Sequence, residues 1–182
     1  MSRGLGDVYK RQIEKYRGHR VQDALSLRCI PQLHGAAKKT FRDAEKTIEI
    51  EMNSCCDNPI LWPEEGNQDV ISACNPDSAY VGMEMDSACI AAVSLAKMSE
   101  RRNNRMIDES LSGYPSFCIA NPGLNSGFMI PQYAAASMVS QNKMYCYAAS
   151  SDSIVSSNGQ EDHVSMGANA ATKLYKVMDN LE

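Results

Sequence analysis

The sequence predicts an all-α protein built as a long antiparallel helical bundle. Apolar residues recur at three- and four-residue steps over four long segments, which is the period of an amphipathic helix. The alternation of apolar and polar residues that marks a strand is nearly absent. The segments between the periodic stretches are rich in Gly, Pro and Asn, which favour turns. Long helices joined by such loops are typical of a bundle.

Composition and charge exclude several classes of protein. The chain has 182 residues, of which 43% are hydrophobic and 22% charged, so a globular domain or a piece of one is expected. The net charge of −4 and the lack of a basic stripe argue against a nucleic-acid partner. The three His lie far apart and the Cys show no CxxC spacing, so no metal site is expected.

The cysteines and the uncharged stretches indicate the cellular location of the protein and whether it spans a membrane. Seven Cys, an odd number, suggest mostly reduced and buried thiols and hence a cytoplasmic protein. No apolar stretch of the kind found in signal peptides occurs in Met1–Gln12. The uncharged run Leu111–Asn142 is long enough to cross a bilayer, but it contains three Pro, three Gly and three Asn. We therefore expect no membrane-spanning helix there.

The first residues do not read like the rest. Met1–Gln12 lacks periodicity, and its end, DVYKRQ, matches a common sequencing-transposon end translated in frame. The hypothesis is that residues 1–12 are a non-native head. The native sequence would then be residues 13–182, a fragment of a larger helical-bundle domain.

The first half of the chain predicts one long helix and one short strand. Residues 13–30 are polar and then mixed in character. A helix is expected over 31–54, with Pro31 in its first turn and its end before Asn58-Pro59, since the residue before Pro avoids the α region. Its apolar positions are Leu33, Ala36, Ala37, Phe41, Ala44, Ile48 and Met52. A short strand is expected over 60–62 and a polar loop over 63–69.

The second half predicts three more helices, over 77–106, 128–148 and 164–182, separated by loops over 111–126 and 149–159. The helix over 77–106 has a broad apolar band of small residues, which permits close approach of neighbouring helices. Its end, Ser99–Arg105 (SERRNNR), is interpreted as a solvated last turn. The helix over 128–148 carries a single charge, Lys143, as expected of a helix enclosed by others.

Glu161 is the first candidate for a catalytic or substrate-binding residue. It lies in Ser156–Gly167 (SSNGQEDHVSMG), just before the last predicted helix, where the helix dipole favours an acidic residue in a simple capped start. Alternatively, Glu161 is a catalytic or substrate-binding carboxylate. Leu111–Ser151 holds only one charged residue, and a carboxylate bordering such a region is expected to be desolvated.

Further polar residues lie in the predicted loops. Arg28 is suited to holding a carboxylate through two hydrogen bonds, although a structural ion pair is an equal alternative. A Ser/His/Asp triad formed with Asp162 and His163 would lack the GxSxG elbow, so it is not favoured. The other polar loop residues are Gln22, Asn75, Asn121 and Asn125.

Five strings resemble, in the same order, the histidine ammonia-lyase and aromatic amino-acid lyase family: VQDALSLRC, EMNSCCDNP, SERRNNRMID, NPGLNSGFMI and QEDHVSMG. The resemblance runs from about Arg20 to Glu182. It implies a piece of a larger all-α lyase subunit that acts as a homotetramer, with several subunits contributing to each active site. It also implies elimination of ammonia by a methylidene-imidazolone (MIO) electrophile that forms from an internal Ala-Ser-Gly triplet, without a metal.

The resemblance assigns roles to individual residues. Arg28 matches the arginine that binds the substrate carboxylate, and Gln22 matches an active-site glutamine. Glu161 matches a glutamate of the substrate pocket, which in histidine lyases is assigned to the imidazole or to base chemistry. Asn125 is a candidate for the pocket wall. Leu25 occupies a further substrate-site position, where the family usually has tyrosine.

The sequence departs from the family pattern at three places. Leu25 can neither donate a hydrogen bond nor take a proton, unlike the usual tyrosine. Pro76 stands where an aromatic pocket residue is expected. No Ala-Ser-Gly triplet occurs, since residues 149–151 read Ala-Ser-Ser. The expectation is an internal fragment that is inactive alone.

The leading hypothesis is a lyase that converts L-histidine to urocanate, because QEDHVSMG is the histidine-type string. A lyase or a 2,3-aminomutase that acts on another aromatic amino acid remains open, as does a lyase-like scaffold without catalysis. Leu25 is the main support for the scaffold.

Overall fold

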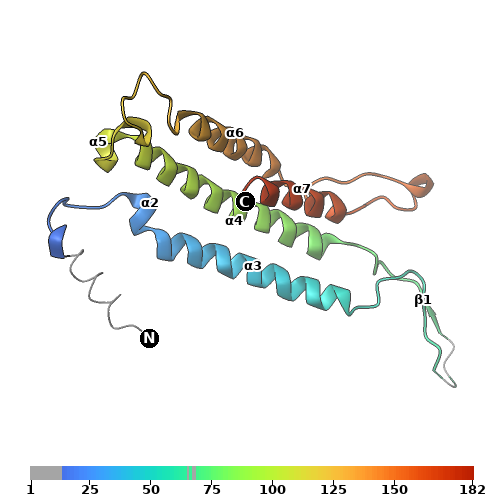
Figure 1. Ribbon diagram of the computed structural model, residues 1–182. Helices are drawn as coiled ribbons and strands as arrows, with labels where there is room; N and C mark the ends of the chain where they lie inside the picture. The colour runs from blue at the N-terminus through green and yellow to red at the C-terminus, as the bar shows by residue number, and fades with distance from the viewer. Residues whose placement is uncertain (1–13, 65, 67–68) are drawn as a thin grey trace.

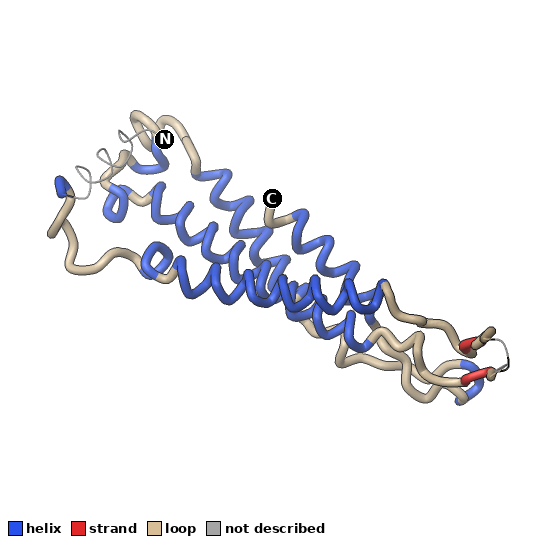
Figure 2. The backbone as a smooth tube through the Cα atoms, turned by 90° about the horizontal axis from the view of Figure 1, so that it is seen from below, coloured by secondary structure: helices blue, strands red, loops and turns tan. Residues whose placement is uncertain are grey.

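The computed structural model describes residues 14–64, 66 and 69–182 (Figure 1). The proposed non-native head, residues 1–12, lies outside the described residues, and that hypothesis stays a prediction. Long helices lie side by side, with a short hairpin and loops extending from one end (Figure 2). The elements in chain order are α2 (Leu25–Arg28), α3 (Ile30–Met52), β1 (Ile60–Leu61), β2 (Val70–Ile71), α4 (Ala79–Ile107), α5 (Glu109–Ser112), η1 (Ser116–Cys118), α6 (Met129–Tyr145), η2 (Ser157–Gly159) and α7 (Gly167–Asp179).

Helix α4 is the centre of the bundle, and α3, α6 and α7 all pack against it. Its small residues explain this, because they let neighbouring backbones come close. Cys89, Ala92 and Val93 form one buried cluster with Val177 of α7, and a second cluster joins α3, α4 and α7. By length and composition α4 is the one helix among the described residues that could cross a membrane, yet half of its apolar window is buried in the bundle.

The predicted all-α fold is confirmed, and α3, α4 and α6 lie within a few residues of their predicted ranges. The last helix begins at Gly167 and not at Val164, because the Val164 amide donates to Ser153 Oγ (3.0 Å) within the preceding loop. Helix α7 runs in the same direction as α4, not antiparallel to it. The long loop after α6 carries the chain back to the N-terminal end of α4 (Figure 1).

Five short elements were missed: α2, β2, α5, η1 and η2. The strand expected over 60–62 is present as β1, but its antiparallel partner β2 was not predicted; Ile60 pairs with Ile71 and Leu61 with Val70. Helix α2 is a single turn within a segment expected to be irregular. All five elements are too short for periodicity to reveal them.

The interpretation of Ser99–Arg105 as a solvated turn was wrong. Glu100 is only 5% exposed and accepts a hydrogen bond from Arg101 Nε (2.5 Å). Arg102 Nε donates to Ser26 O (3.0 Å), and Asn104 Oδ1 accepts from Gln132 Nε2 (2.6 Å). The segment is therefore a polar junction that joins α4 to α2 and α6.

The expected burial of the cysteines was also wrong. Cys89 alone is buried, whereas Cys55, Cys56 and Cys74 are exposed. The exposed thiols lie in the loops that follow α3 and precede α4, where no helix covers them.

The N-termini of α4 and α7 meet at a serine junction. Ser78 N donates to Ser165 Oγ (2.8 Å), and Gly167 N donates to Ser78 Oγ (3.2 Å). A Cβ on Gly167 would lie 2.6 Å from Ser78 Cβ and 2.9 Å from Ser78 O. Only glycine fits at this contact, and the junction fixes how the loop before α7 leaves the bundle.

Gly167→Ala is expected to lower the free energy of unfolding by about 1–2 kcal/mol, because the added methyl group displaces Ser78. Gly35→Ala is the matched control: Gly35 is helical and a Cβ there meets nothing within 4 Å. That change should raise stability by up to about 1 kcal/mol through helix propensity. Urea unfolding followed by circular dichroism measures both; equal stability of Gly167→Ala and wild type would contradict the close contact.

Candidate functional site

The predicted site residues lie at two opposite ends of the bundle. Gln22, Leu25 and Arg28 immediately precede α3, and the loop that holds Asn125 lies at the same end (Figure 1). Glu161 lies in the loop at the other end, beyond the C-terminus of α3. Helix α3 has 23 residues, and at 1.5 Å per residue the two ends are about 35 Å apart.

The Arg28 end carries an exposed guanidinium. Arg28 Nε donates to Asp23 O (2.7 Å), which closes the turn from Asp23 to Arg28. No other hydrogen bond of this side chain occurs within the described part of the chain. The two terminal nitrogens of the guanidinium can therefore bind a carboxylate end-on. Leu25 is 62% exposed on the same turn and Gln22 is exposed beside it.

Asn125 closes its own loop. Its Nδ2 donates to Ala120 O (3.3 Å), and its backbone bridges to Pro122. The loop is tightly built: Gly127 has φ +48°, and a Cβ there would lie 2.9 Å from Ile119 Cβ. The structure thus gives Asn125 a structural contact, and its place in a pocket wall stays a prediction.

Glu161 lines a polar cavity of about 420 Å³. Three loops form it: the one after α3, the one before α4 and the one before α7. Pro76, which stands where the resemblance leads one to expect an aromatic residue, lies in its wall. The lining residues are Asn58, Ala73, Cys74, Pro76, Asp77, Gln160, Glu161, Asp162, His163, Val164 and Ser165.

Glu161 is exposed, not desolvated as the sequence suggested. The hydroxyl of Ser156 and the hydroxyl of Ser157 (2.8 Å) both donate to Glu161 Oε2, and these hydrogen bonds lower the pKa of the carboxyl. Glu161 also precedes α7 by six residues, so it is not a cap of that helix. These hydrogen bonds favour the ionised form of the side chain.

His163 connects the Glu161 loop to the start of α4. Its Nδ1 lies 3.4 Å from Ser153 Oγ and its Nε2 3.6 Å from Asp77 Oδ2. The acidic neighbour of His163 is therefore Asp77 and not Asp162. Sequence reasoning missed Asp77 because it is far from His163 along the chain.

Asn58 is a second residue of the cavity that sequence reasoning passed over. Its Oδ1 accepts hydrogen bonds from Ala73 N (3.1 Å) and Ser72 Oγ (3.3 Å), which brings the loop after α3 against the loop before α4. The sequence could have identified Asn58 as a candidate, because it belongs to one of the family-like strings, EMNSCCDNP.

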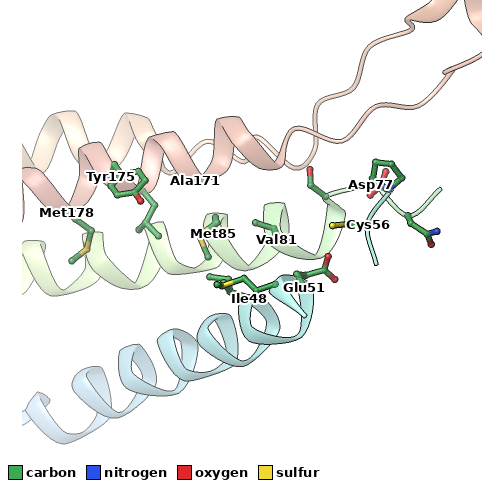
Figure 3. Close-up of a pocket in the computed structure, with 14 residues that line it drawn as sticks. Ile48, Glu51, Cys56, Asp77, Val81, Met85, Ala171, Tyr175 and Met178 are labelled. Atoms are coloured by element: carbon green, nitrogen blue, oxygen red, sulfur yellow. The ribbon is translucent and has the colours of Figure 1, made fainter. Parts of the chain in front are cut away.

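A larger groove of about 620 Å³ lies between α3, α4 and α7 (Figure 3). Its floor is apolar, formed by Ile48, Val81, Met85 and Met178. Of the candidate polar residues named from the sequence, Asn75 lines it, whereas Glu161 and Arg28 do not. It shares Pro76 and Asp77 with the Glu161 cavity. The groove offers packing surface but no cluster of reactive groups.

The sequence contains no Ala-Ser-Gly triplet, the string that the resemblance leads one to expect for the electrophile. The nearest string to Ala-Ser-Gly is Ala149-Ser150-Ser151, and the Ser150 amide donates to Asp86 Oδ2 (2.8 Å), which is a structural use of that backbone. No group of three His, Cys, Asp or Glu suited to a metal ion occurs among the residues that the structure describes.

Comparison with known proteins agrees with these features. The family model described as aromatic amino acid lyase matches residues 4–182. A histidine ammonia-lyase from Alkaliphilus metalliredigens is 50% identical over 161 residues, which cover 88% of this chain and 31% of that protein. The chain thus spans about a third of the length of the curated relatives it matches.

Solved structures show the same arrangement of helices. Histidine ammonia-lyase from Trypanosoma cruzi superposes with a TM-score of 0.83 at 42% identity, covering 88% of this chain and 31% of that one. Phenylalanine aminomutase from Pantoea agglomerans gives a TM-score of 0.83 at 32% identity, covering 97% of this chain and 36% of that one. From its helices, its strings and these matches, the chain belongs to the aromatic amino acid lyase family.

Proposed function

We propose that this chain is part of an ammonia-lyase that converts L-histidine to urocanate in the cytoplasm. The observation that carries the proposal is the polar cavity around ionised Glu161, built from the histidine-type string QEDHVSMG. The curated relatives at about half identity, named histidine ammonia-lyase, support the same substrate. An MIO group, formed from a triplet outside this chain, would supply the electrophile of the reaction.

Two side chains divide the binding of the amino acid. The terminal nitrogens of Arg28 hold the α-carboxylate, and the Glu161 carboxylate accepts the imidazole N–H. Hydrogen bonds from Ser156 and Ser157 lower the pKa of Glu161 and favour its anionic form, which suits a role in orienting the ring. Leu25, at the usual tyrosine position, has no atom that can act as the base.

One copy of the chain cannot bring Arg28 and Glu161 to the same substrate. A helix of 23 residues separates them, and an amino acid is far shorter than the resulting distance of about 35 Å. We therefore propose that each site takes Arg28 from one subunit and Glu161 from another, within a homotetramer.

Subunit complementation tests this arrangement. The intact protein that contains this chain is prepared as Arg28→Met and as Glu161→Gln, and the two are unfolded together and reassembled. Random mixing should leave about one quarter of the sites with both wild-type side chains, so urocanate absorbance should recover toward that fraction. Each variant reassembled alone is the control. No recovery in mixed tetramers would contradict a site shared between subunits.

Glu161→Gln is expected to lower kcat/KM for L-histidine by about 10²-fold, because a charged acceptor is exchanged for a neutral one. The glutamine oxygen still accepts from Ser156 and Ser157, so the loop should keep its conformation. Asp162→Asn removes an adjacent charge of the same cavity and serves as the control. An equal loss of kcat/KM in both variants would mean that the overall negative charge of the cavity matters, and not a specific contact of Glu161.

A second candidate is a scaffold without catalysis, favoured by Leu25, which is 62% exposed and offers no proton. A third is a 2,3-aminomutase, favoured by the likeness to phenylalanine aminomutase. Product analysis separates them: urocanate indicates the histidine lyase, and a β-amino acid indicates the mutase. No turnover of histidine or any aromatic amino acid by the intact protein indicates the scaffold.

A further inference from the structure

Helix α2 carries Arg28 but is not held by apolar packing. None of its four residues is buried. Leu25 is 62% and Leu27 47% exposed. At its C-terminal end α2 continues through Cys29 into α3, which fixes that end covalently. Its other end needs contacts with the rest of the bundle if the guanidinium of Arg28 is to have a defined position.

Two arginines supply these contacts, in opposite directions. Arg102, on α4, donates from Nε to the Ser26 carbonyl in the middle of α2 (3.0 Å). Arg20, just before α2, donates from Nη2 to the Leu111 carbonyl beyond the end of α4 (2.5 Å). Both acceptors are backbone oxygens, so each bond fixes the path of the chain itself.

Arg102 differs from the other arginines of its string. Arg101 is exposed and pairs with its neighbour Glu100. Arg102 is partly buried, and its Nη2 is shielded from solvent without an acceptor among the described residues. A guanidinium held in this way is poorly placed for solvation. The hydrogen bond from Nε to the Ser26 carbonyl of α2 is the contact that this guanidinium makes.

We propose that Arg102 and Arg20 form a clamp that positions Arg28 for the substrate carboxylate. The proposal rests on the function proposed above and adds two positioning residues to it. Ser26 lies between Asp23, whose carbonyl accepts from Arg28 Nε (2.7 Å), and Arg28 itself. Holding the Ser26 carbonyl therefore holds both the guanidinium and the carbonyl that orients it.

The test compares Arg102→Met with Arg105→Met in the intact protein. Arg105 lies on the same helix, and its side chain makes no hydrogen bond within the described residues. Arg102→Met should raise KM for the amino acid by about 10- to 100-fold and leave kcat within a few-fold, because a displaced binding group costs affinity first. Arg105→Met should leave both constants unchanged, and Arg102→Lys, which restores a donor, should recover part of the loss. A fall in kcat alone would overturn the proposal.

A double-mutant cycle with Arg28→Met shows whether Arg102 acts through Arg28. If it does, Arg102→Met adds little to the loss that Arg28→Met already causes. Full additivity of the two losses would overturn the proposal, since it would mean that Arg102 acts independently of Arg28.

Hydrogen exchange gives a readout that does not depend on activity. The amides of Leu27, Arg28 and Cys29 donate to carbonyls of Ala24 and Leu25 within the turn. They should exchange at least about tenfold faster in Arg102→Met than in Arg105→Met, while amides of α4 stay protected. Unchanged exchange overturns the clamp even if the enzyme is active. Faster exchange in a protein without lyase activity would refute the proposed function and leave the clamp standing.

Discussion

Arg28→Met is expected to lower kcat/KM of the intact protein by about 10³-fold, mainly through KM, because truncating one partner of a charged, hydrogen-bonded pair costs several kcal/mol. Among the residues that the structure describes, the guanidinium is engaged only through Nε, by Asp23 O, so its terminal nitrogens are available. Arg28→Lys keeps the charge but loses the planar pair of donors, so it should recover only part of the activity. Steady-state kinetics with L-histidine measures all three proteins.

An exposed arginine of the neighbouring helix provides the control. Arg42→Met, on α3, removes the same charge from the outer face of the bundle and should leave KM unchanged. If Arg28→Met also left KM unchanged, the substrate carboxylate would have to bind elsewhere. A structural role for Arg28 would then be the better interpretation.

The second large effect concerns a buried ion pair that joins α4, α7 and the loop after α6. Asp86 is 6% exposed, and its Oδ1 lies 2.6 Å from Lys173 Nζ. Its Oδ2 accepts from Ser150 N (2.8 Å), and Lys173 also donates to Tyr147 O. Burial raises the pKa of Asp86, but the hydrogen bonds from Lys173 and Ser150 together outweigh it, so the pKa is lowered from 3.8.

Asp86→Asn is therefore expected to lower the free energy of unfolding by about 3 kcal/mol at neutral pH, because it leaves the largely buried Lys173 without its charge partner. A lowered pKa means that the folded state favours the ionised form. This contribution is complete above the ordinary pKa, near 3.8, and is lost as pH falls through the lower folded value. The stability difference between wild type and Asp86→Asn should shrink below about pH 4.

Urea unfolding between pH 7 and pH 3 measures this difference. Asp43→Asn is the control, since Asp43 pairs with Lys39 on the outer face of α3, where both side chains are at least half exposed. Water screens that pair, so its loss should change stability much less. A difference for Asp86→Asn that stayed constant down to pH 3 would mean that the ion pair is not its source.

The sequence predicted the long helices well because helical period is a local property. Successive apolar residues along α3 and α4 mark the buried face whatever the helix packs against. The strings around Arg28 and Glu161 likewise identified the family before any geometry was known. The elements that sequence reasoning missed, α2, β2, α5, η1 and η2, contain two to four residues each and are too short to show a periodic pattern.

The environment of individual side chains could not be predicted in this way. The Ser99–Arg105 string is charged and looks solvated, yet Glu100 is buried and Arg102 reaches Ser26. Glu161 borders an uncharged region and was expected to be desolvated, yet it is exposed and held by two serines of its own loop. In both cases the deciding contacts depend on how the loops fold back on the bundle.

The sequence by itself determined the helices, the family and the chemical groups available, because each of these depends on residues that lie close together along the chain. Tertiary structure alone decided that Arg28 and Glu161 lie at opposite ends of the bundle, and that Arg102 holds the turn carrying Arg28. The physical reason is that a rigid helix of fixed rise per residue separates the two ends. Which groups can share a substrate is set by that distance and not by their order in the sequence.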